Sequence, residues 1–325
     1  MAEPWGRLPI SSCRDAAIAA QPAPPPKLAY IAIGLGVLAL GCSALFVRWA
    51  AAPGPVTGFY RMALATLVLT PLALRHPAGA ASAWPRRGVL LALLGGLSLS
   101  IDLALWNTAV GLTSAANATL FANTAPLWVA LVAWAAMGER LRPLFWTGLA
   151  VTMLGAAAVA GADFRSHSGL GVGDMLAILA SFFYAGYYLL TQIGRRTLRS
   201  APYVWLAGLA SSASLLTISL ALGLPLTGYP LPTYLSFIAL ALVTQAFGYL
   251  AVGYALGHLP ASVVSPTMVG QPIVTAILAI PLLSEALSPT QIVGGAAVLA
   301  GILLVYRSRL SGRTPEPEIA PQSAD

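Results

Sequence analysis

The sequence predicts an all-α membrane protein with ten transmembrane helices, arranged as two inverted five-helix repeats. Three observations support this prediction: an apolar composition, ten apolar segments of similar length, and an internal duplication. Of the 325 residues, 58% are hydrophobic and only 8% are charged. A soluble domain carries about 25% charged residues, so most of this chain must lie in lipid.

Each of the ten apolar segments is close to the ~20 residues that a helix needs to cross the hydrocarbon core. The expected spans are 28–50, 55–74, 88–110, 113–137, 143–162, 173–193, 202–224, 232–256, 260–284 and 289–306. Residues 1–27 and 307–325 are polar and contain several prolines, so we expect them to be disordered tails.

The basic residues predict the orientation of the chain. With both tails in the cytoplasm, 14 of the 17 Lys and Arg residues fall in cytoplasmic segments; the exceptions are Arg48, Arg61 and Arg165. Such an excess of positive charge marks the cytoplasmic side. We therefore expect a multi-pass protein of a bacterial inner membrane with cytoplasmic tails at 1–27 and 307–325.

The duplication relates the end of each half of the chain. A constant shift of 146 residues aligns Gly111–Gly155 with Gly257–Gly301 without a gap. The matched pairs that shared hydrophobicity does not explain are Gly111 and Gly257, Pro126 and Pro272, Glu139 and Glu285, Gly148 and Gly294, and Gly155 and Gly301. Duplicated units of this kind reveal the architecture before any single motif does.

The two copies are expected at residues 28–162 and 173–306, with five spans each. An odd number of spans turns the second copy upside down in the membrane. Inverted repeats are typical of secondary transporters, whose substrate site lies between the halves near the midplane.

The chain resembles the EamA family of the drug/metabolite transporter superfamily. The similarity rests on short spans, small loops, Arg61, Gly173-Asp174, and the repeated order of small residues, Pro, Gly-Glu or Ser-Glu, and Gly. It covers about residues 28–306; one departure is Ser284 where the first copy has glycine. The resemblance implies a carrier of small metabolites. Similar members include exporters of amino acids, among them aromatic amino acids and threonine or homoserine, whereas others move sugars or nucleosides.

Two charged residues, Arg61 and Asp102, lie well inside predicted spans, where charge is costly and usually functional; Arg48, near the outer end of its span, is expected to be a snorkelling anchor rather than a ligand. Arg61 and Asp102 are about six and eight residues from the outer ends of their spans, or roughly 9 and 12 Å deep. They could form a structural ion pair. Alternatively, Arg61 binds a substrate carboxylate, or Asp102 carries a coupling proton.

Polar residues beside prolines recur in the spans 113–137 and 260–284. Pro126 and Pro272 cannot donate to the helix ladder, so they are expected to act as hinges that free a backbone carbonyl. Freed carbonyls are tolerated at membrane depth where they line a cavity. The candidate pathway residues here are Asn117, Asn123 and Gln271; ordinary helix packing by small polar residues is the alternative.

Aromatic and amide side chains complete the candidate substrate site. Tyr184 and Tyr188 are four residues apart and share a helix face, where they are expected to stack on a planar substrate. The other candidates are Trp106, Asn107, Phe121, Gln245 and Tyr249. For Trp106, an interfacial aromatic belt is the alternative.

Two repeated features are expected to be structural. The glycine pairs at 148/155 and 294/301 are seven residues apart, so they share a face and permit close helix contact. Glu139 and Glu285 end their spans and are expected to accept hydrogen bonds from neighbouring loops or to pair with nearby arginines.

Other functional classes are less consistent with the sequence. The three histidines lie in separate loops, the two cysteines have no metal spacing, and no nucleophile or phosphate-binding motif occurs. A membrane enzyme is therefore disfavoured, and a channel fits inverted repeats less well than alternating access. Small multidrug exporters of the same superfamily use an acid in their first span, which 28–50 lacks.

The sequence thus predicts a secondary transporter that exports a small metabolite, with an amino acid that has an aromatic or apolar side chain as the best candidate. Carriers of nucleosides, sugars or drug-like amphiphiles remain alternatives. The expected partners are a small-molecule substrate and the lipid bilayer. We expect no cofactor, no metal and no nucleic acid, and a monomer or homodimer.

Overall fold

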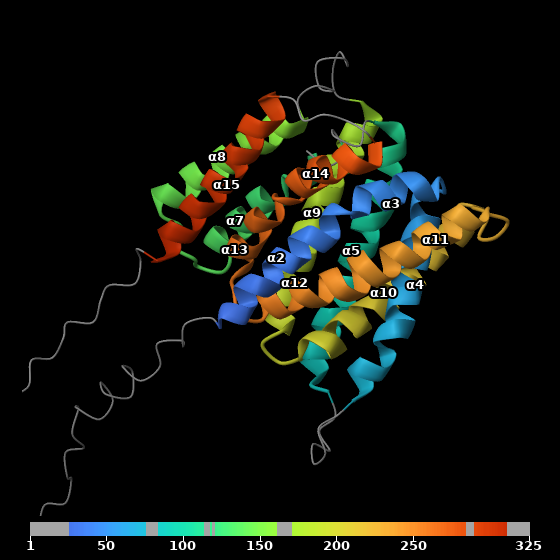
Figure 1. The fold of residues 1–325 in the computed structure, drawn as a ribbon. Coiled ribbons are helices and arrows are strands. Elements are labelled where there is room, and N and C mark those ends of the chain that lie inside the picture. The colour runs from blue at the N-terminus through green and yellow to red at the C-terminus, as the bar shows by residue number, and fades with distance from the viewer. Residues whose placement is uncertain are drawn as a thin grey trace, which may run out of the picture.

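The computed structural model describes residues 26–75, 84–113, 118, 121–160, 171–283 and 289–310. Within these ranges the chain forms helices and short connections, with no strand. The expected tails, apart from 26–27 and 307–310, lie outside the described residues. The elements are α2 (Lys27–Gly41), α3 (Ser43–Ala50), α4 (Gly54–Leu74), α5 (Arg86–Leu112), α7 (Ala125–Ala135), α8 (Pro143–Ala160), α9 (Val172–Gly194), α10 (Ser200–Ala221), α11 (Leu231–Ala239), the π-helix η2 (Leu240–Gly248), α12 (Tyr249–Leu256), α13 (Ala261–Met268), α14 (Gln271–Leu283) and α15 (Pro289–Leu310) (Figure 1).

Six helical segments are long and apolar enough to cross a membrane, so this is a multi-pass membrane protein. They are Lys27–Ala50, Gly54–Leu74, Arg86–Leu112, Val172–Gly194, Ser200–Ala221 and Leu231–Leu256. Three further apolar helices are shorter: Ala125–Ala135, Pro143–Ala158 and Ile292–Ser308. The described helices lie within all ten expected spans, but the number of crossings stays a prediction.

Three of the expected spans are interrupted. The first bends at Cys42, between α2 and α3. Residues 123–124 form a turn immediately before α7, and residues 269–270 form the equivalent turn between α13 and α14. Pro126 and Pro272 are the second residues of α7 and α14, where the missing N–H of proline costs no helix bond. Both repeats therefore contain a discontinuous helix at the same place.

The expected span 232–256 contains a different irregularity. Its α-helical ends, α11 and α12, are joined by the nine-residue π-helix η2. A π-helix bonds residue i to i+5 and is rare, and such segments often occur at functional sites. It changes the faces on which Gln245 and Tyr249 lie, compared with a regular α-helix.

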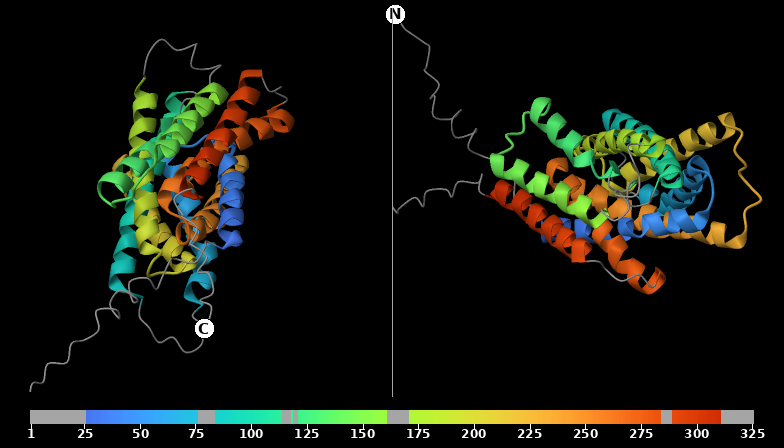
Figure 2. Two further views of the ribbon diagram at one scale, coloured as in Figure 1. Left: turned by 90° about the vertical axis from the view of Figure 1, so that its left-hand side faces the viewer. Right: turned by 90° about the horizontal axis from the view of Figure 1, so that it is seen from above.

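The antiparallel pair α8 and α15 confirms the expected glycine packing (Figures 1 and 2). A Cβ atom on Gly148 would lie 2.9 Å from the carbonyl oxygen of Gly301, and one on Gly155 would lie 2.7 Å from that of Gly294. Gly148 corresponds to Gly294 in the repeat, and Gly155 to Gly301. Gly148 therefore meets the counterpart of Gly155, and Gly155 meets the counterpart of Gly148, as expected for two units related by a two-fold axis.

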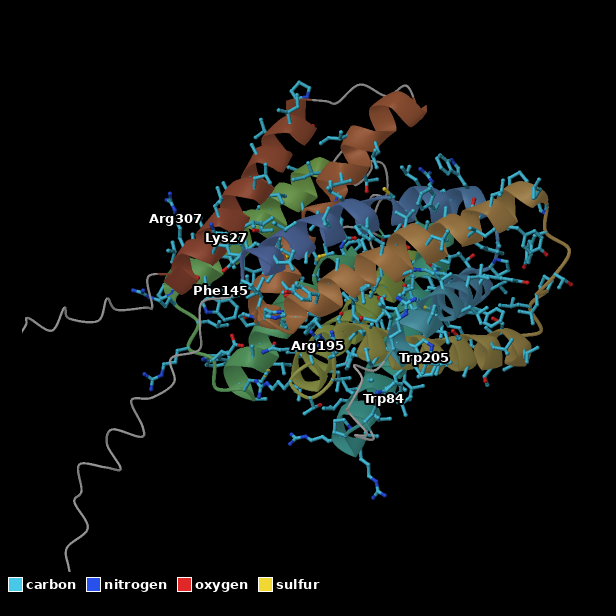
Figure 3. The ribbon with its side chains drawn as sticks, turned by 60° about the horizontal axis from the view of Figure 1, so that its bottom comes forward. Lys27, Trp84, Phe145, Arg195, Trp205 and Arg307 are labelled. Carbon is cyan, nitrogen blue, oxygen red and sulfur yellow. The ribbon has the colours of Figure 1, made fainter. Side chains whose placement is uncertain are left out.

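Both described ends of the chain lie at the same end of the bundle. The rings of Tyr30 in α2 and Tyr306 in α15 have centroids 5.7 Å apart. Figure 3 shows Lys27 and Arg307 close together at this end. The connection between α9 and α10, which carries Arg195, Arg196 and Arg199, is near it as well. We call this the arginine-rich end.

Candidate functional site

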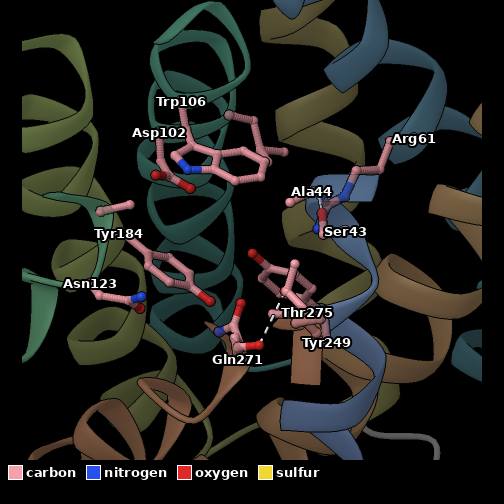
Figure 4. Close-up of a pocket in the computed structure, with 13 residues that line it drawn as sticks. Ser43, Ala44, Arg61, Asp102, Trp106, Asn123, Tyr184, Tyr249, Gln271 and Thr275 are labelled. Carbon is pink, nitrogen blue, oxygen red and sulfur yellow. Dashed lines mark hydrogen bonds between the residues drawn. The ribbon is translucent and has the colours of Figure 1, made fainter. Parts of the chain in front are cut away.

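A small cavity lies where α2, α3, α4, α5, α9, α12 and α14 meet, next to the turn that precedes α7. Its volume is about 60 Å³. Figure 4 shows polar groups from several helices pointing into it. The lining residues are Leu40, Ser43, Ala44, Arg61, Asp102, Leu103, Trp106, Ala122, Asn123, Tyr184, Tyr249, Gln271 and Thr275. Seven of the twelve predicted substrate-binding residues are among them: Arg61, Asp102, Trp106, Asn123, Tyr184, Tyr249 and Gln271.

Arg61 is a buried cation held by neutral groups. Its side chain is 2% exposed. Its Nε donates to Oε1 of Gln245 at 2.9 Å, and its Nη1 donates to Oγ of Ser43 at 3.0 Å. Its guanidinium carbon lies 5.5 Å from the ring centroid of Tyr249. These contacts fix the guanidinium but do not neutralise it, and a buried charge is costly until an opposite charge joins it.

Asp102 faces the same cavity from α5, across from Arg61 (Figure 4). It is 6% exposed, and its carboxylate accepts no hydrogen bond from any described residue. A direct salt bridge between the two residues, one of the expected alternatives, is not formed in the described part of the chain. Ser43 and Gln245 engage Arg61 instead, so the cavity separates the two charges.

The helix interruptions place polar groups from both repeats in the cavity. Asn123 lies in the turn before α7, and its buried Nδ2 has no hydrogen-bond partner among the described residues. Gln271 begins α14 on the opposite repeat. The hydroxyl of Thr275 donates to the carbonyl of Gly41 at 2.7 Å, at the end of α2. A second contact to the Gln271 carbonyl, at 3.2 Å, is drawn in Figure 4. The cavity therefore offers both donors and acceptors.

Aromatic rings form the less polar wall. Trp106, Tyr184 and Tyr249 line the cavity. Tyr188 does not: it is 1% exposed, and its ring centroid is 4.5 Å from that of Tyr184. Tyr188 thus packs against Tyr184 without lining this cavity, and its expected stacking on a substrate stays a prediction.

Three other predicted residues contact neighbours rather than the cavity. Gln245 positions Arg61, as described. Asn107 donates from Nδ2 to the carbonyl of Gly54 at 3.1 Å, which ties α5 to the start of α4. Phe121 packs with a small cluster around Ala118. Asn117 lies outside the described residues.

Two polar residues that line the cavity, Ser43 and Thr275, were not predicted from the sequence. Ser43 directly follows the break between α2 and α3, and Thr275 lies one helical turn after Gln271. Short hydroxyl side chains usually bond to their own helix, so neither stood out. Thr275 could nevertheless have been recognised in the sequence, because it lies one helical turn after Gln271, which precedes Pro272.

The arginine-rich end of α13 is held by both repeats. Oε2 of Glu139 accepts a hydrogen bond from the hydroxyl of Ser262 at 2.7 Å. Oε1 of Gln192 accepts one from the backbone N–H of Ala261, also at 2.7 Å. Glu139 thus accepts a hydrogen bond from the first turn of α13, a helix, where a loop or a nearby arginine was expected, and Glu285 lies outside the described residues. These contacts join α13 to α9 and to the α7–α8 connection.

Comparisons with known proteins agree with this architecture. A solved crystal structure superposes with a TM-score of 0.72 at 19% identity, covering 88% of this chain and 99% of the other. The chain is 28% identical to a "Probable terminal-alkyne amino-acid exporter" of Streptantibioticus cattleyicolor, over 82% of this chain and 92% of the relative. It is 23% identical to an uncharacterized transporter of Bacillus subtilis, over 72% and 77% of the two chains.

The sequence model of the EamA-like transporter family matches twice, at residues 27–161 and 171–307. These two matches include every helix described above apart from the last three residues of α15. The chain therefore belongs to the EamA-like transporter family.

Proposed function

We propose that this protein is a secondary transporter that exports an amino acid with an apolar side chain across a bacterial inner membrane. The observation that carries the proposal is the pair of buried opposite charges, Arg61 and Asp102, on facing sides of one cavity. A free amino acid carries a carboxylate and an ammonium group close together. It is the kind of ligand that complements both charges at once.

Each part of the ligand then has a partner. The carboxylate binds the remaining N–H groups of Arg61, which its contacts to Gln245 and Ser43 hold in place. The ammonium group binds Asp102, and the apolar side chain contacts Trp106 and Tyr184. The name of the Streptantibioticus relative, which refers to an amino acid with a terminal alkyne, supports this substrate class and the export direction.

The volume of the cavity supports alternating access. Ligand pockets usually measure ~300–1,000 Å³, whereas this cavity holds about 60 Å³. The helices must therefore separate before a substrate can enter. Opening toward the arginine-rich end requires the contacts of Glu139 and Gln192 with α13 to break. In this proposal all ten segments cross the membrane, and that end faces the cytoplasm.

The proposal is tested by uptake into proteoliposomes that contain the purified protein. We expect saturable uptake of labelled apolar amino acids, with competition by free amino acids and much weaker competition by their methyl esters, which lack the carboxylate. Nucleosides and sugars serve as the comparison panel. Saturable transport of a nucleoside or sugar, without transport of any amino acid, would overturn the substrate class.

Two arginine variants distinguish a specific role of Arg61 in the cavity from a general effect of changing the arginines of the protein. Arg61→Lys keeps the charge but loses the planar donor geometry, so it should reduce the preference for free amino acids over esters. Arg48→Gln removes an exposed arginine on α3 that does not line the cavity, and should leave that preference unchanged. Equal effects of the two variants would contradict the role given to Arg61.

A further inference from the structure

A second, larger cavity lies at the arginine-rich end and shares no lining residue with the first. It measures about 1190 Å³ and is bounded by the start of α2, the end of α4, the two residues that precede α5, the α9–α10 connection, the start of α10, η2 and α12. Figure 3 shows Trp84 and Arg195, two of its lining residues, on neighbouring parts of this end. We call it the basic groove.

The rim of the basic groove is rich in positive charge. Arg75, Arg196 and Arg199 line it and are exposed, and their guanidinium groups have no hydrogen-bond or salt-bridge partner in the described part of the chain. No acidic residue is among the described lining residues. Exposed arginines with no protein partner are available to bind an anion from outside the protein.

Arg195 forms the fixed centre of this rim. Its Nε donates to the carbonyl of Gly253 at 2.7 Å, and its Nη1 donates to the carbonyl of Leu198. Burial is the main cause that lowers the pKa of Arg195, and the charge of nearby Arg199 acts in the same direction. The like charges at the rim therefore repel one another, and an anion bound between them would relieve that repulsion.

The wall of the groove has the opposite character. Leu28, Leu72 and Phe247 line it and are 55%, 44% and 50% exposed. All three belong to helical segments that are long and apolar enough to cross a membrane. The groove therefore presents cationic donors at its rim and apolar side chains on its wall, a combination that matches a molecule with an anionic head and apolar chains.

We propose that the basic groove binds an anionic phospholipid, with its phosphate on Arg196 and Arg199 and its acyl chains along Leu28, Leu72 and Phe247. Basic pockets between transmembrane helices on one side of a membrane recognise anionic head groups. A soluble phosphate would use the rim but leave the apolar wall without a partner. A zwitterionic lipid would use the wall but gain little from the unpaired arginines.

Native mass spectrometry of the purified full-length protein tests this proposal. After mild delipidation, either phosphatidylglycerol or phosphatidylcholine is added back, and the bound fraction is measured as a function of lipid concentration. We expect phosphatidylglycerol to bind with a defined stoichiometry and phosphatidylcholine to bind much more weakly. Millimolar inorganic phosphate should not displace the bound lipid.

The variant Arg196→Gln/Arg199→Gln removes two exposed charges from the rim. It should weaken phosphatidylglycerol binding about 30-fold, from about fivefold per basic residue. Arg86→Gln/Arg87→Gln is the matched control, because it removes two exposed arginines at the start of α5 that do not line the groove. Arg196→Lys/Arg199→Lys keeps the charge and should retain most of the binding.

Four results would overturn the proposal. An equal loss in the Arg86/Arg87 control would show that the overall charge of this end, and not the groove, attracts the lipid. Equal binding of phosphatidylcholine would remove the role of the arginines. Displacement by inorganic phosphate, or a raised KM for the transported amino acid without a change in lipid binding, would assign the rim to a soluble anion.

Discussion

Asp102→Asn is expected to weaken the binding of an amino acid by about 10- to 150-fold while leaving the binding of its des-amino analogue unchanged. Asp102 is 6% exposed and lines the cavity, yet accepts no hydrogen bond from any described residue. The substitution therefore removes a charge from the site without breaking an internal hydrogen bond. A hydrogen bond to a charged group contributes about 1.5–3 kcal/mol, which corresponds to the stated range in Kd.

Isothermal titration calorimetry with the two ligands measures the effect directly. Asp174→Asn is the matched control, because Asp174 is also buried but does not line the cavity. It accepts hydrogen bonds from Thr113 at 2.8 Å and from the backbone N–H of Gly171 at 3.0 Å. That variant should lower stability without changing the preference between the ligands. Unchanged amino-acid affinity in Asp102→Asn, or an equal loss for both ligands, would refute the assignment of Asp102 to the ammonium group.

Three further predictions address packing and opening. Gly301→Ala would place a Cβ atom 2.5 Å from a backbone nitrogen of α8, so the melting temperature of this variant should fall clearly. Gly34→Ala is the control: its Cβ atom would have no neighbouring atom within 4 Å, so the melting temperature should stay nearly unchanged. Gln192→Ala removes a hydrogen bond from α13 of about 1 kcal/mol, so a thiol reagent should label Ser265→Cys about fivefold faster; equal labelling rates would contradict the proposed opening. Thr275→Val should lower stability by about 1 kcal/mol in denaturant unfolding, because the variant no longer donates to the end of α2; an unchanged midpoint would argue against that contact.

Features with a strong local cause could be predicted from the sequence. The glycine pairs of α8 and α15 were predictable, since equal spacing on one helix face leaves few roles other than close packing. Arg61 and Asp102 were expected to be functional because ionisable residues are rare inside spans, and both do line the cavity. An irregularity near Pro126 and Pro272 was also expected, but as a kink that frees a backbone carbonyl; in the structure each proline is the second residue of a new helix, where its missing N–H costs no helix bond.

Features that depend on helix geometry could not be predicted in the same way. Tyr184 and Tyr188 share a helix face, but only Tyr184 lines the cavity. Helical periodicity shows which residues share a face, but it does not show how far along the helix a cavity extends. Gln245 contacts Arg61 from a π-helix, which has no sequence signature here. The bend at Cys42, which positions Ser43, occurs without a proline.

The contact between α8 and α15 restricts how the two halves of the chain can diverge. Gly148 and Gly155 meet Gly301 and Gly294 backbone to backbone, so a larger side chain in either half would separate both helices. Elsewhere the halves have acquired different residues, such as Asn123 in one and Val269 at the matching position in the other. After a gene duplication, the two copies can therefore acquire different residues at the substrate site. At the crossing of α8 and α15, however, a larger side chain in either copy would clash with the backbone of the other, so both copies must retain their glycines.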